Sequence, residues 1–199
     1  MSTELVQLAP EADVSRPADA ELLERTLAAA TKQRQTVHPD GVRVHDGLEG
    51  VIRTHVPTHV DERGWLVELF DPRAEQWTEP FAYAYATSVR PGYAKGWGLH
   101  KEHDDRYTLL FGHVEVLLYD VRPTSSTLGR LARYQLSEFD RGHLVIPAYV
   151  WHTMRNIGST DVVVINFPTA AFDHRHPDKY SLPLNTDLIP FALGDTPGW

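Results

Sequence analysis

The fold is decided by Gly98-Leu-His100, followed by Asp105 and Gly112, and by the later run Pro147-Ala-Tyr-Val-Trp-His-Thr-Met-Arg-Asn156. Gly112 follows Asp105 by seven residues, and His152 lies five residues after Pro147 and four residues before Asn156. The two stretches therefore combine two histidines and a carboxylate with glycine, proline and asparagine at regular spacing.

This spacing resembles the two-part signature of the cupins, β-barrels whose facing strands bring histidines into one pocket. His100 occupies the second histidine position of the first half, and Gly98 occupies the first, so one of the usual metal ligands is replaced. The resemblance implies an all-β cupin jelly-roll barrel, with His100 and His152 in its pocket.

Composition narrows the class of protein. The 199 residues carry a formal net charge of −8, without a basic block, which argues against nucleic acid as a partner. Cysteine is absent, so disulfides and thiolate metal sites are excluded. Neither a signal peptide nor an apolar run long enough to cross a membrane is found. We expect a cytoplasmic protein with no membrane partner.

The chain is predicted to consist of an N-terminal extension, residues 1–45, and a cupin domain, residues 46–199. Apolar residues recur at steps of three and four from Asp19 to about Gln35, which predicts one helix packed on the barrel or on a neighbouring subunit. From Gly50 onward, short segments rich in β-branched and aromatic residues alternate with Gly, Pro, Asp and Ser clusters, the pattern of a jelly roll. The tail from Phe172 to Trp199 is expected to wrap the barrel as irregular structure.

Chemistry is expected around His100. On a strand, Gly98 and His100 point to the same face, so the missing side chain is predicted to leave open space beside the imidazole. His100, Asp105 and His152 together would also suit iron, manganese or zinc. His103 is either a replacement ligand or an exposed loop residue.

A second cluster is Asp61-Glu-Arg63-Gly-Trp65-Leu-Val-Glu68. The Arg63 guanidinium follows a predicted turn, where it can bind phosphate oxygens in a forked geometry. Trp65 offers an apolar surface for stacking on a base or sugar. A hairpin turn with a surface ion pair is the structural alternative.

The order of these motifs over residues 50–191 resembles the dTDP-4-dehydrorhamnose 3,5-epimerase family. The resemblance implies a homodimer that acts on a nucleotide sugar and requires no metal. It makes His100 the catalytic base, oriented by Asp187. By the same resemblance Arg63 contacts the diphosphate, Glu68 lies near the nucleobase, and His152 lines the pocket. We further expect Lys95 to contact the diphosphate and Trp65 to lie at the nucleobase end.

Three positions depart from that family. Ile165, with Asn166 beside it, stands where the family has the tyrosine that acts as general acid. Asp105 stands in place of a lysine, and Trp97 in place of an arginine. Tyr149 and Tyr107 are candidate hydroxyl donors. The loss of the acid favours epimerisation at one carbon over two, and Asp105 is expected to alter the chemistry most.

The sequence therefore predicts an epimerase or isomerase of a nucleotide-linked 4-keto-6-deoxy sugar. Two alternatives stay open. One is a metal-dependent cupin that uses His100, Asp105 and His152, and the other is a non-catalytic carbohydrate-binding cupin.

Overall fold

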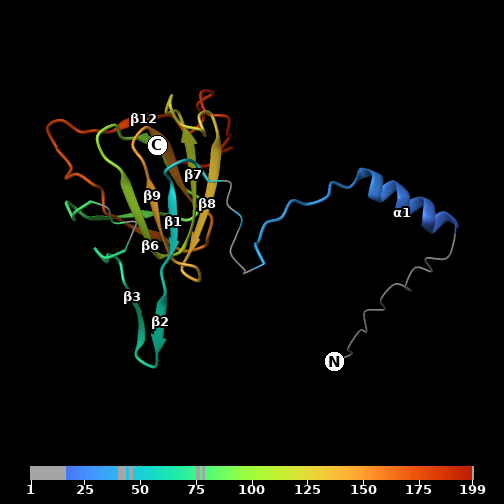
Figure 1. Cartoon of the computed structure of the whole chain (residues 1–199), viewed down its shortest axis with the longest axis horizontal. Coiled ribbons are helices and arrows are strands. Elements are labelled where there is room, and N and C mark those ends of the chain that lie inside the picture. Colours follow the sequence, from blue (N-terminus) through green and yellow to red (C-terminus); the bar gives the residue numbers. More distant parts are fainter. Residues whose placement is uncertain (1–16, 40–43, 45–46, 75–76, 78, 199) are drawn as a thin grey trace. The chain divides into compact units, whose positions relative to one another are not determined.

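The computed structural model describes residues 17–39, 44, 47–74, 77 and 79–198. The chain divides into two units, residues 1–45 and 46–199, which are described separately. In the first unit, α1 covers Pro17–Ala29 and so ends before the predicted Gln35 (Figure 1). The leucines of its apolar stripe, Leu22, Leu23 and Leu27, are exposed.

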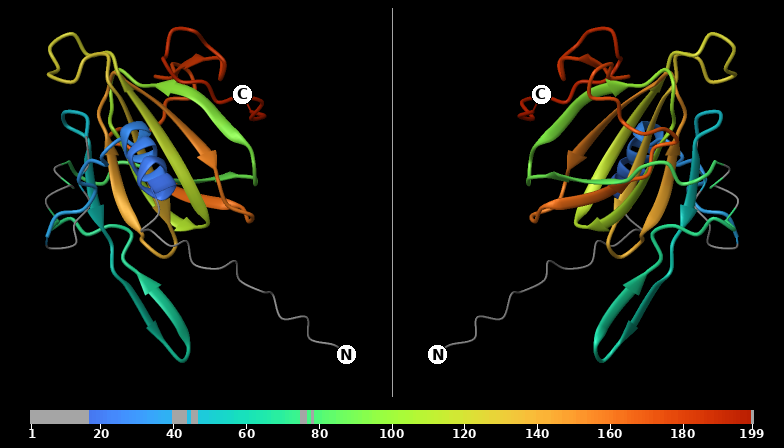
Figure 2. Two further views of the ribbon diagram at one scale, coloured as in Figure 1. Left: turned by 90° about the vertical axis from the view of Figure 1, so that its right-hand side faces the viewer. Right: turned by 90° about the vertical axis from the view of Figure 1, so that its left-hand side faces the viewer.

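The second unit is built from two five-stranded antiparallel sheets that face each other (Figure 2). In spatial order, the first sheet contains β1 (Ile52–His55), β9 (Gly142–Ile146), β6 (Asp105–Phe111), β11 (Val162–Asn166) and β4 (Tyr85–Val89). The second contains β12 (Tyr180–Leu182), β5 (Ala94–Leu99), β10 (Val150–Asn156), β7 (His113–Asp120) and β8 (Leu131–Ser137). The predicted all-β jelly-roll class is confirmed.

The main core lies between the sheets. It includes Leu109 and Val164 from the first sheet and Val116, Leu118 and Leu136 from the second. Along β8, buried residues alternate with more exposed ones, as expected for a strand with one face on the core.

The C-terminal tail builds a second, smaller core on the other face of the second sheet. Ile189 and Leu193 of the tail are buried with Trp97 of β5 and Leu117 of β7. The strands beneath the tail are therefore covered on both faces, which explains the nearly continuous apolar run of β7. Most of the tail is irregular, as predicted, but its residues 180–182 form β12, which pairs with β5. This strand was not predicted.

A two-stranded hairpin forms a separate sheet and extends away from the barrel (Figures 1 and 2). It consists of β2 (Thr58–Asp61) and β3 (Gly64–Val67), joined by a turn. Trp65 packs edge to face on Phe111 of the barrel, with ring centroids 5.4 Å apart. Among the described residues, no helix combines the length and the apolar character that a membrane span requires.

The signature residues Gly112 and Asn156 hold turns. The Asn156 amide donates hydrogen bonds to the carbonyls of Val89 and Thr160, and its oxygen accepts one from the Gly158 backbone. Gly112 has a φ of 87°, in the left-handed region where residues with side chains are strained. These two signature residues therefore serve the fold rather than the pocket.

We predict that Gly112→Ala destabilises the protein more than Gly92→Ala, the matched control. Both glycines have positive φ, so each substitution should cost about 1–2 kcal/mol of unfolding free energy. At Gly112 the new Cβ would also lie 2.8 Å from the Asp161 carbonyl oxygen, whereas nothing lies within 4 Å at Gly92. This clash should add a further ~1–3 kcal/mol. Equal losses in urea unfolding of the two variants would contradict the prediction.

Candidate active site

A cavity of about 470 Å³ lies between the two sheets. Strands β5, β10 and β12 of the second sheet and β4 and β6 of the first contribute to its lining. Groups on opposite walls of this cavity therefore come from different sheets, and a molecule bound in it would be approached from both.

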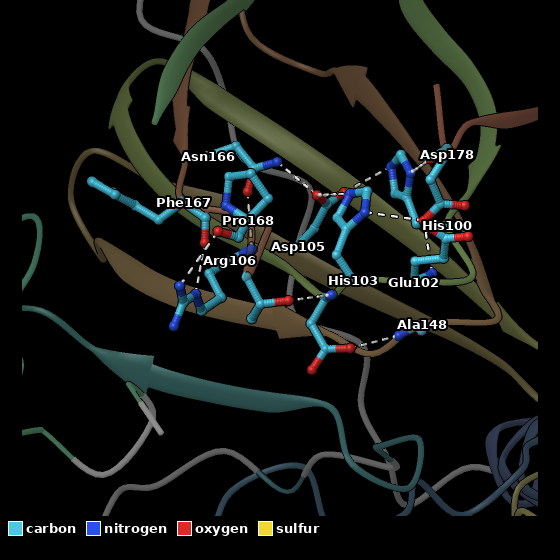
Figure 3. A network of polar contacts seen from close by, with 12 residues as sticks. His100, Glu102, His103, Asp105, Arg106, Ala148, Asn166, Phe167, Pro168 and Asp178 are labelled. Carbon is cyan, nitrogen blue, oxygen red and sulfur yellow. Dashed lines mark hydrogen bonds and ion pairs between the residues drawn. The ribbon is translucent and has the colours of Figure 1, made fainter. Parts of the chain in front are cut away.

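The carboxylate of Asp105 lies at the centre of the polar residues in this cavity (Figure 3). Asp105 begins β6 and is only 2% exposed. Its Oδ2 atom lies 3.5 Å from Nε2 of His100 and 3.3 Å from Nε2 of His152. The sequence prediction that these three residues share one pocket is therefore matched by the geometry.

Two neutral side chains donate further hydrogen bonds to Asp105. The Tyr107 hydroxyl donates to Oδ2 over 3.2 Å, and the Asn166 amide donates to Oδ1 over 2.7 Å. A buried carboxylate is costly unless hydrogen bonds and charges compensate it, and here both oxygens are engaged. Tyr107 therefore directs its proton to Asp105.

Backbone carbonyls set which nitrogen of each histidine faces Asp105. Nδ1 of His100 donates to the carbonyl of Asp178, and Nδ1 of His152 donates to that of Val150 over 3.2 Å. A carbonyl oxygen only accepts, so each Nδ1 carries a hydrogen. In the neutral form, the basic nitrogen of both rings is therefore Nε2, which faces Asp105.

The pKa values of the three groups diverge. Burial acts to raise the pKa of Asp105, but the hydrogen bond from His100 and the charges of both histidines hold it well below its usual value. Burial acts to lower the pKa of His100, but the hydrogen bond and charge of Asp105 overcome this effect and raise it. For His152, burial prevails and lowers the pKa. His100 is thus the imidazole that takes up a proton, beside an ionised Asp105.

Gly98 lines the cavity, as the predicted open space requires. A Cβ built on Gly98 would lie 3.3 Å from Nε2 of His152, its directly paired residue on β10. The His152 ring therefore borders the space at Gly98. Local strand geometry did not predict this neighbour, because it leaves out the adjacent strand.

His103 belongs to the pocket rather than to an exposed loop. Its ring lies 4.2 Å from that of His100, between centroids, and its Nδ1 lies 3.0 Å from Oδ2 of Asp178. Asp178 also accepts hydrogen bonds from the backbone amides of Lys101 and Glu102. The loop after β5 is thus fastened to the segment that precedes β12.

The histidines and carboxylates of the pocket could also bind a divalent metal ion. Potential ligand atoms of His100, Asp105 and His152 all lie within 4.8 Å of one another, and so do those of His100, His103 and Asp178. Two imidazoles and a carboxylate suit iron, manganese or zinc. Histidines that bind metals also commonly donate their other N–H to a carbonyl, as both do here.

Lys95 lines the cavity because of a register shift. His152 pairs with Gly98, but two residues further on Met154 pairs with Lys95 instead of Gly96. Directly paired residues point to the same face, so the irregularity turns Lys95 toward the pocket. Simple alternation from Gly98 would have directed it outward.

Two of the residues proposed from the sequence lie elsewhere. Asp187 is exposed and outside the cavity lining, and the carboxylates near His100 are those of Asp105 and Asp178. Tyr149, also outside the lining, is 45% exposed and has a φ of 60°; its backbone N–H donates to the His100 carbonyl. The predictions that Asp187 orients His100 and that Tyr149 presents its hydroxyl to the pocket were therefore wrong.

Arg63, Trp65 and Glu68 do not line this chain's cavity either. All three are exposed and lie on the hairpin or directly after it. The Arg63 side chain is 82% exposed and pairs with Asp61, as the structural alternative predicted.

The residues that sequence reasoning missed include Lys179 and Tyr85 of the cavity lining, and Asp178, which contacts His100 and His103. Asp178 and Lys179 precede β12, which has only three residues and was read as irregular tail. Tyr85 lies in a predicted strand, but nothing in the neighbouring sequence indicates which side chains of that strand point into the barrel. The alternating Tyr-Ser-Leu of β12 was the one available signal for that strand.

Comparison with known proteins places this architecture in a defined class. The model of the polysaccharide biosynthesis C-terminal domain family matches residues 59–180. The spore coat polysaccharide biosynthesis protein SpsL of Bacillus subtilis (strain 168) is 32% identical over 144 residues, 72% of this chain and 95% of the relative. The probable low-salt glycan biosynthesis epimerase Agl13 of Haloferax volcanii is 31% identical over 126 residues, 63% of this chain and 81% of the relative.

Solved structures of sugar isomerases and epimerases have the same fold as this chain. A dTDP sugar isomerase from Desulfovibrio desulfuricans G20 is 27% identical, with a TM-score of 0.69 over 75% of this chain and 95% of that one. Three dTDP-4-dehydrorhamnose 3,5-epimerases share the fold at 14–23% identity. The fold is thus that of the sugar-epimerase jelly-roll class, and the predicted resemblance is confirmed. Within that class, the chain belongs to the polysaccharide biosynthesis C-terminal domain family.

We predict that Asp105→Asn lowers the pKa of His100. In the unchanged protein this pKa lies above 6.5, so stabilisation by the ion pair is present below pH 6.5 and is lost as the pH rises through the pKa of His100. The substitution removes the charge that favours the imidazolium. Histidine NMR titration would measure both pKa values.

The matched control is Asp187→Asn, which removes an exposed carboxylate outside the pocket. It should leave the His100 titration unchanged. A His100 pKa below 6.5 in the unchanged protein, or one insensitive to Asp105→Asn, would contradict the assignment.

Proposed function

We propose that this protein is an epimerase or isomerase that acts on a nucleotide-linked 4-keto-6-deoxy sugar by removing a proton beside the ketone. The observation that carries the proposal is the pair formed by His100 and Asp105 inside the cavity. The predicted enzyme class agrees with the names of the relatives Agl13 and the dTDP sugar isomerase.

The ketone supplies the acidity and the protein supplies the base. A C4 ketone acidifies the hydrogens on C3 and C5, because the electron pair left behind is delocalised onto the carbonyl oxygen. Nε2 of His100 is oriented by the Asp178 carbonyl, and Asp105 stabilises the imidazolium that forms. A positioned base with a pKa near the working pH is suited to this step.

The lysines of the pocket are proposed to bind the diphosphate. Lys95 and Lys179 both line the cavity, and burial, followed by the charge of Lys179, lowers the pKa of Lys95. Two cations close enough to influence each other form a positive region suited to phosphate oxygens. Lys95 thus keeps its predicted role, and Lys179 is added to it.

The nucleobase end is proposed to be completed by a second copy of the chain. Arg63, Trp65 and Glu68 are exposed on and after the hairpin, outside their own chain's cavity. In a symmetric dimer the same hairpin on each copy can reach the other's pocket. This arrangement would reconcile the predicted nucleotide contacts with their observed position. We also propose that the protein is a homodimer and is cytoplasmic.

A metal-dependent reaction is the second candidate, favoured by the grouping of His100, Asp105 and His152. The metal would be held by the Nε2 atoms of the histidines and the Asp105 carboxylate, and would supply Lewis-acid chemistry when bound. In the first proposal no metal is required. A carbohydrate-binding protein without activity is the third candidate, in which His100 would contribute to affinity alone.

The test of the proposed function is proton NMR of dTDP-4-keto-6-deoxyglucose with the protein in heavy water. We expect exchange at C3 or C5, and a fall in its rate by about 100-fold or more in His100→Ala, because the base is removed. Chelator treatment should leave the rate unchanged.

Each other outcome selects an alternative. A rate lost with chelator and restored by iron, manganese or zinc would favour the metal-dependent reaction. Binding of the nucleotide sugar without exchange would favour the binding protein or a different sugar, and neither binding nor exchange would remove the epimerase proposal.

Mixing inactive variants tests the dimer. Arg63→Ala and His100→Ala should each be inactive alone, but a mixed dimer contains one pocket with both residues intact. After subunit exchange the mixture should recover roughly a quarter of normal activity, since half of the dimers are mixed and each has one working pocket. No recovery, with mixed dimers shown by mass spectrometry, would place Arg63 outside the partner's pocket.

A further inference from the structure

Epimerisation needs a proton donor as well as a base. The base removes a proton from one face of the carbon, and inversion requires that a proton be returned to the opposite face. Ile165 and Asn166 stand where the resembling family has its acidic tyrosine, and neither is an acid. The inference below rests on the proposed function and concerns which side chain supplies that proton.

Three polar residues form a row across adjacent strands of the first sheet. Asn166 of β11 pairs directly with Tyr107 of β6 on one side and with Tyr85 of β4 on the other. Directly paired residues share a face of the sheet, and both tyrosines line the cavity. A tyrosine therefore lies on each side of Asn166.

The two tyrosines differ in where their protons go. The Tyr107 hydroxyl donates to Asp105. The Tyr85 oxygen instead accepts a hydrogen bond of 3.0 Å from the Asn166 amide, which also donates to Asp105. Among the described residues, no acceptor takes the Tyr85 proton, so it is available to a molecule in the cavity.

The position of Tyr85 relative to His100 suits a donor to the opposite face. His100 follows β5 in the second sheet, whereas Tyr85 belongs to β4 at the edge of the first. Both side chains line the same cavity. A sugar ring bound between the sheets would thus meet the imidazole on one face and the hydroxyl on the other.

We propose that Tyr85 is a further catalytic residue, the acid that protonates the sugar carbon on the face opposite to His100. Tyr85 lies on the strand next to Ile165 and Asn166, which stand where the resembling family has its general-acid tyrosine, and it would take over the role of that tyrosine. Burial, followed by the charge of Asp105, raises the pKa of Tyr85 to about 12, so the hydroxyl is protonated at neutral pH. Its role is thus to give a proton rather than to take one.

The step balances without any further reactant. The C–H bond beside the ketone breaks, its proton moves to Nε2 of His100, and its electron pair forms the enolate. The enolate carbon then forms a new C–H bond with the Tyr85 proton, the ketone is restored, and a tyrosinate remains. Asn166 stabilises that tyrosinate by its hydrogen bond. Solvent takes the proton from His100 and returns one to Tyr85.

The variant that tests this is Tyr85→Phe, which removes only the hydroxyl. Tyr83→Phe is the matched control, because Tyr83 lines the same cavity and its ring lies 5.9 Å from that of Tyr85, between centroids. For each protein, NMR of dTDP-4-keto-6-deoxyglucose in heavy water gives two rates, deuterium incorporation at C3 or C5 and formation of the inverted sugar.

We expect Tyr85→Phe to lose inversion by about 100-fold or more, while deuterium incorporation falls by less than about 10-fold. The reason is that His100 still removes the proton and returns a deuteron to the same face. Tyr83→Phe should keep the ratio of inversion to exchange found in the unchanged protein.

Two results would overturn the proposal. One is that Tyr85→Phe leaves both rates unchanged, and the other is an equal loss of both rates with unaltered thermal stability and dTDP affinity. If the unchanged protein itself shows no exchange, the proposed function fails first, so the two failures are distinguishable.

Discussion

The site depends on one buried negative charge. Asp105 is removed from water at the start of β6, and such a charge persists only where partners compensate it. Its partners come from both sheets: His100 and His152 from the second, and Tyr107 and Asn166 from the first. The contacts that compensate the cost of burying the carboxylate therefore also link the two walls of the cavity.

The shared carboxylate also divides the work of the two imidazoles. Both rings turn Nε2 toward Asp105, but the pKa of His100 is raised and that of His152 is lowered. Of the two imidazoles, His100 is thus the one that binds a proton more strongly, in keeping with its proposed role as base. The His152 ring lies beside Gly98, and both residues line the cavity.

The tail and the hairpin extend the barrel in different directions. The segment before β12 brings the Asp178 carbonyl and carboxylate to the histidines and adds Lys179 to the pocket. The hairpin carries Arg63 away from its own pocket. One addition therefore brings residues to the histidines within the chain, whereas the other carries the residues that we propose to complete a nucleotide end shared between two chains.

By itself, the sequence determined the fold class and the meeting of His100, Asp105 and His152. Strand patterns are local, because alternation and turn residues act over a few positions, and the two-part signature carries the register of the strands that hold these three residues. The tertiary structure alone decided the rest. A register shift turns Lys95 inward, and pairing of β12 with β5 brings Asp178 to His100 and Lys179 to the pocket. Pairing of β11 with β4 sets Tyr85 beside Asn166 in the cavity wall. The wrong assignments of Asp187 and Tyr149 have the same cause, since cross-strand pairing and the path of an irregular tail are set by contacts between residues far apart in the chain.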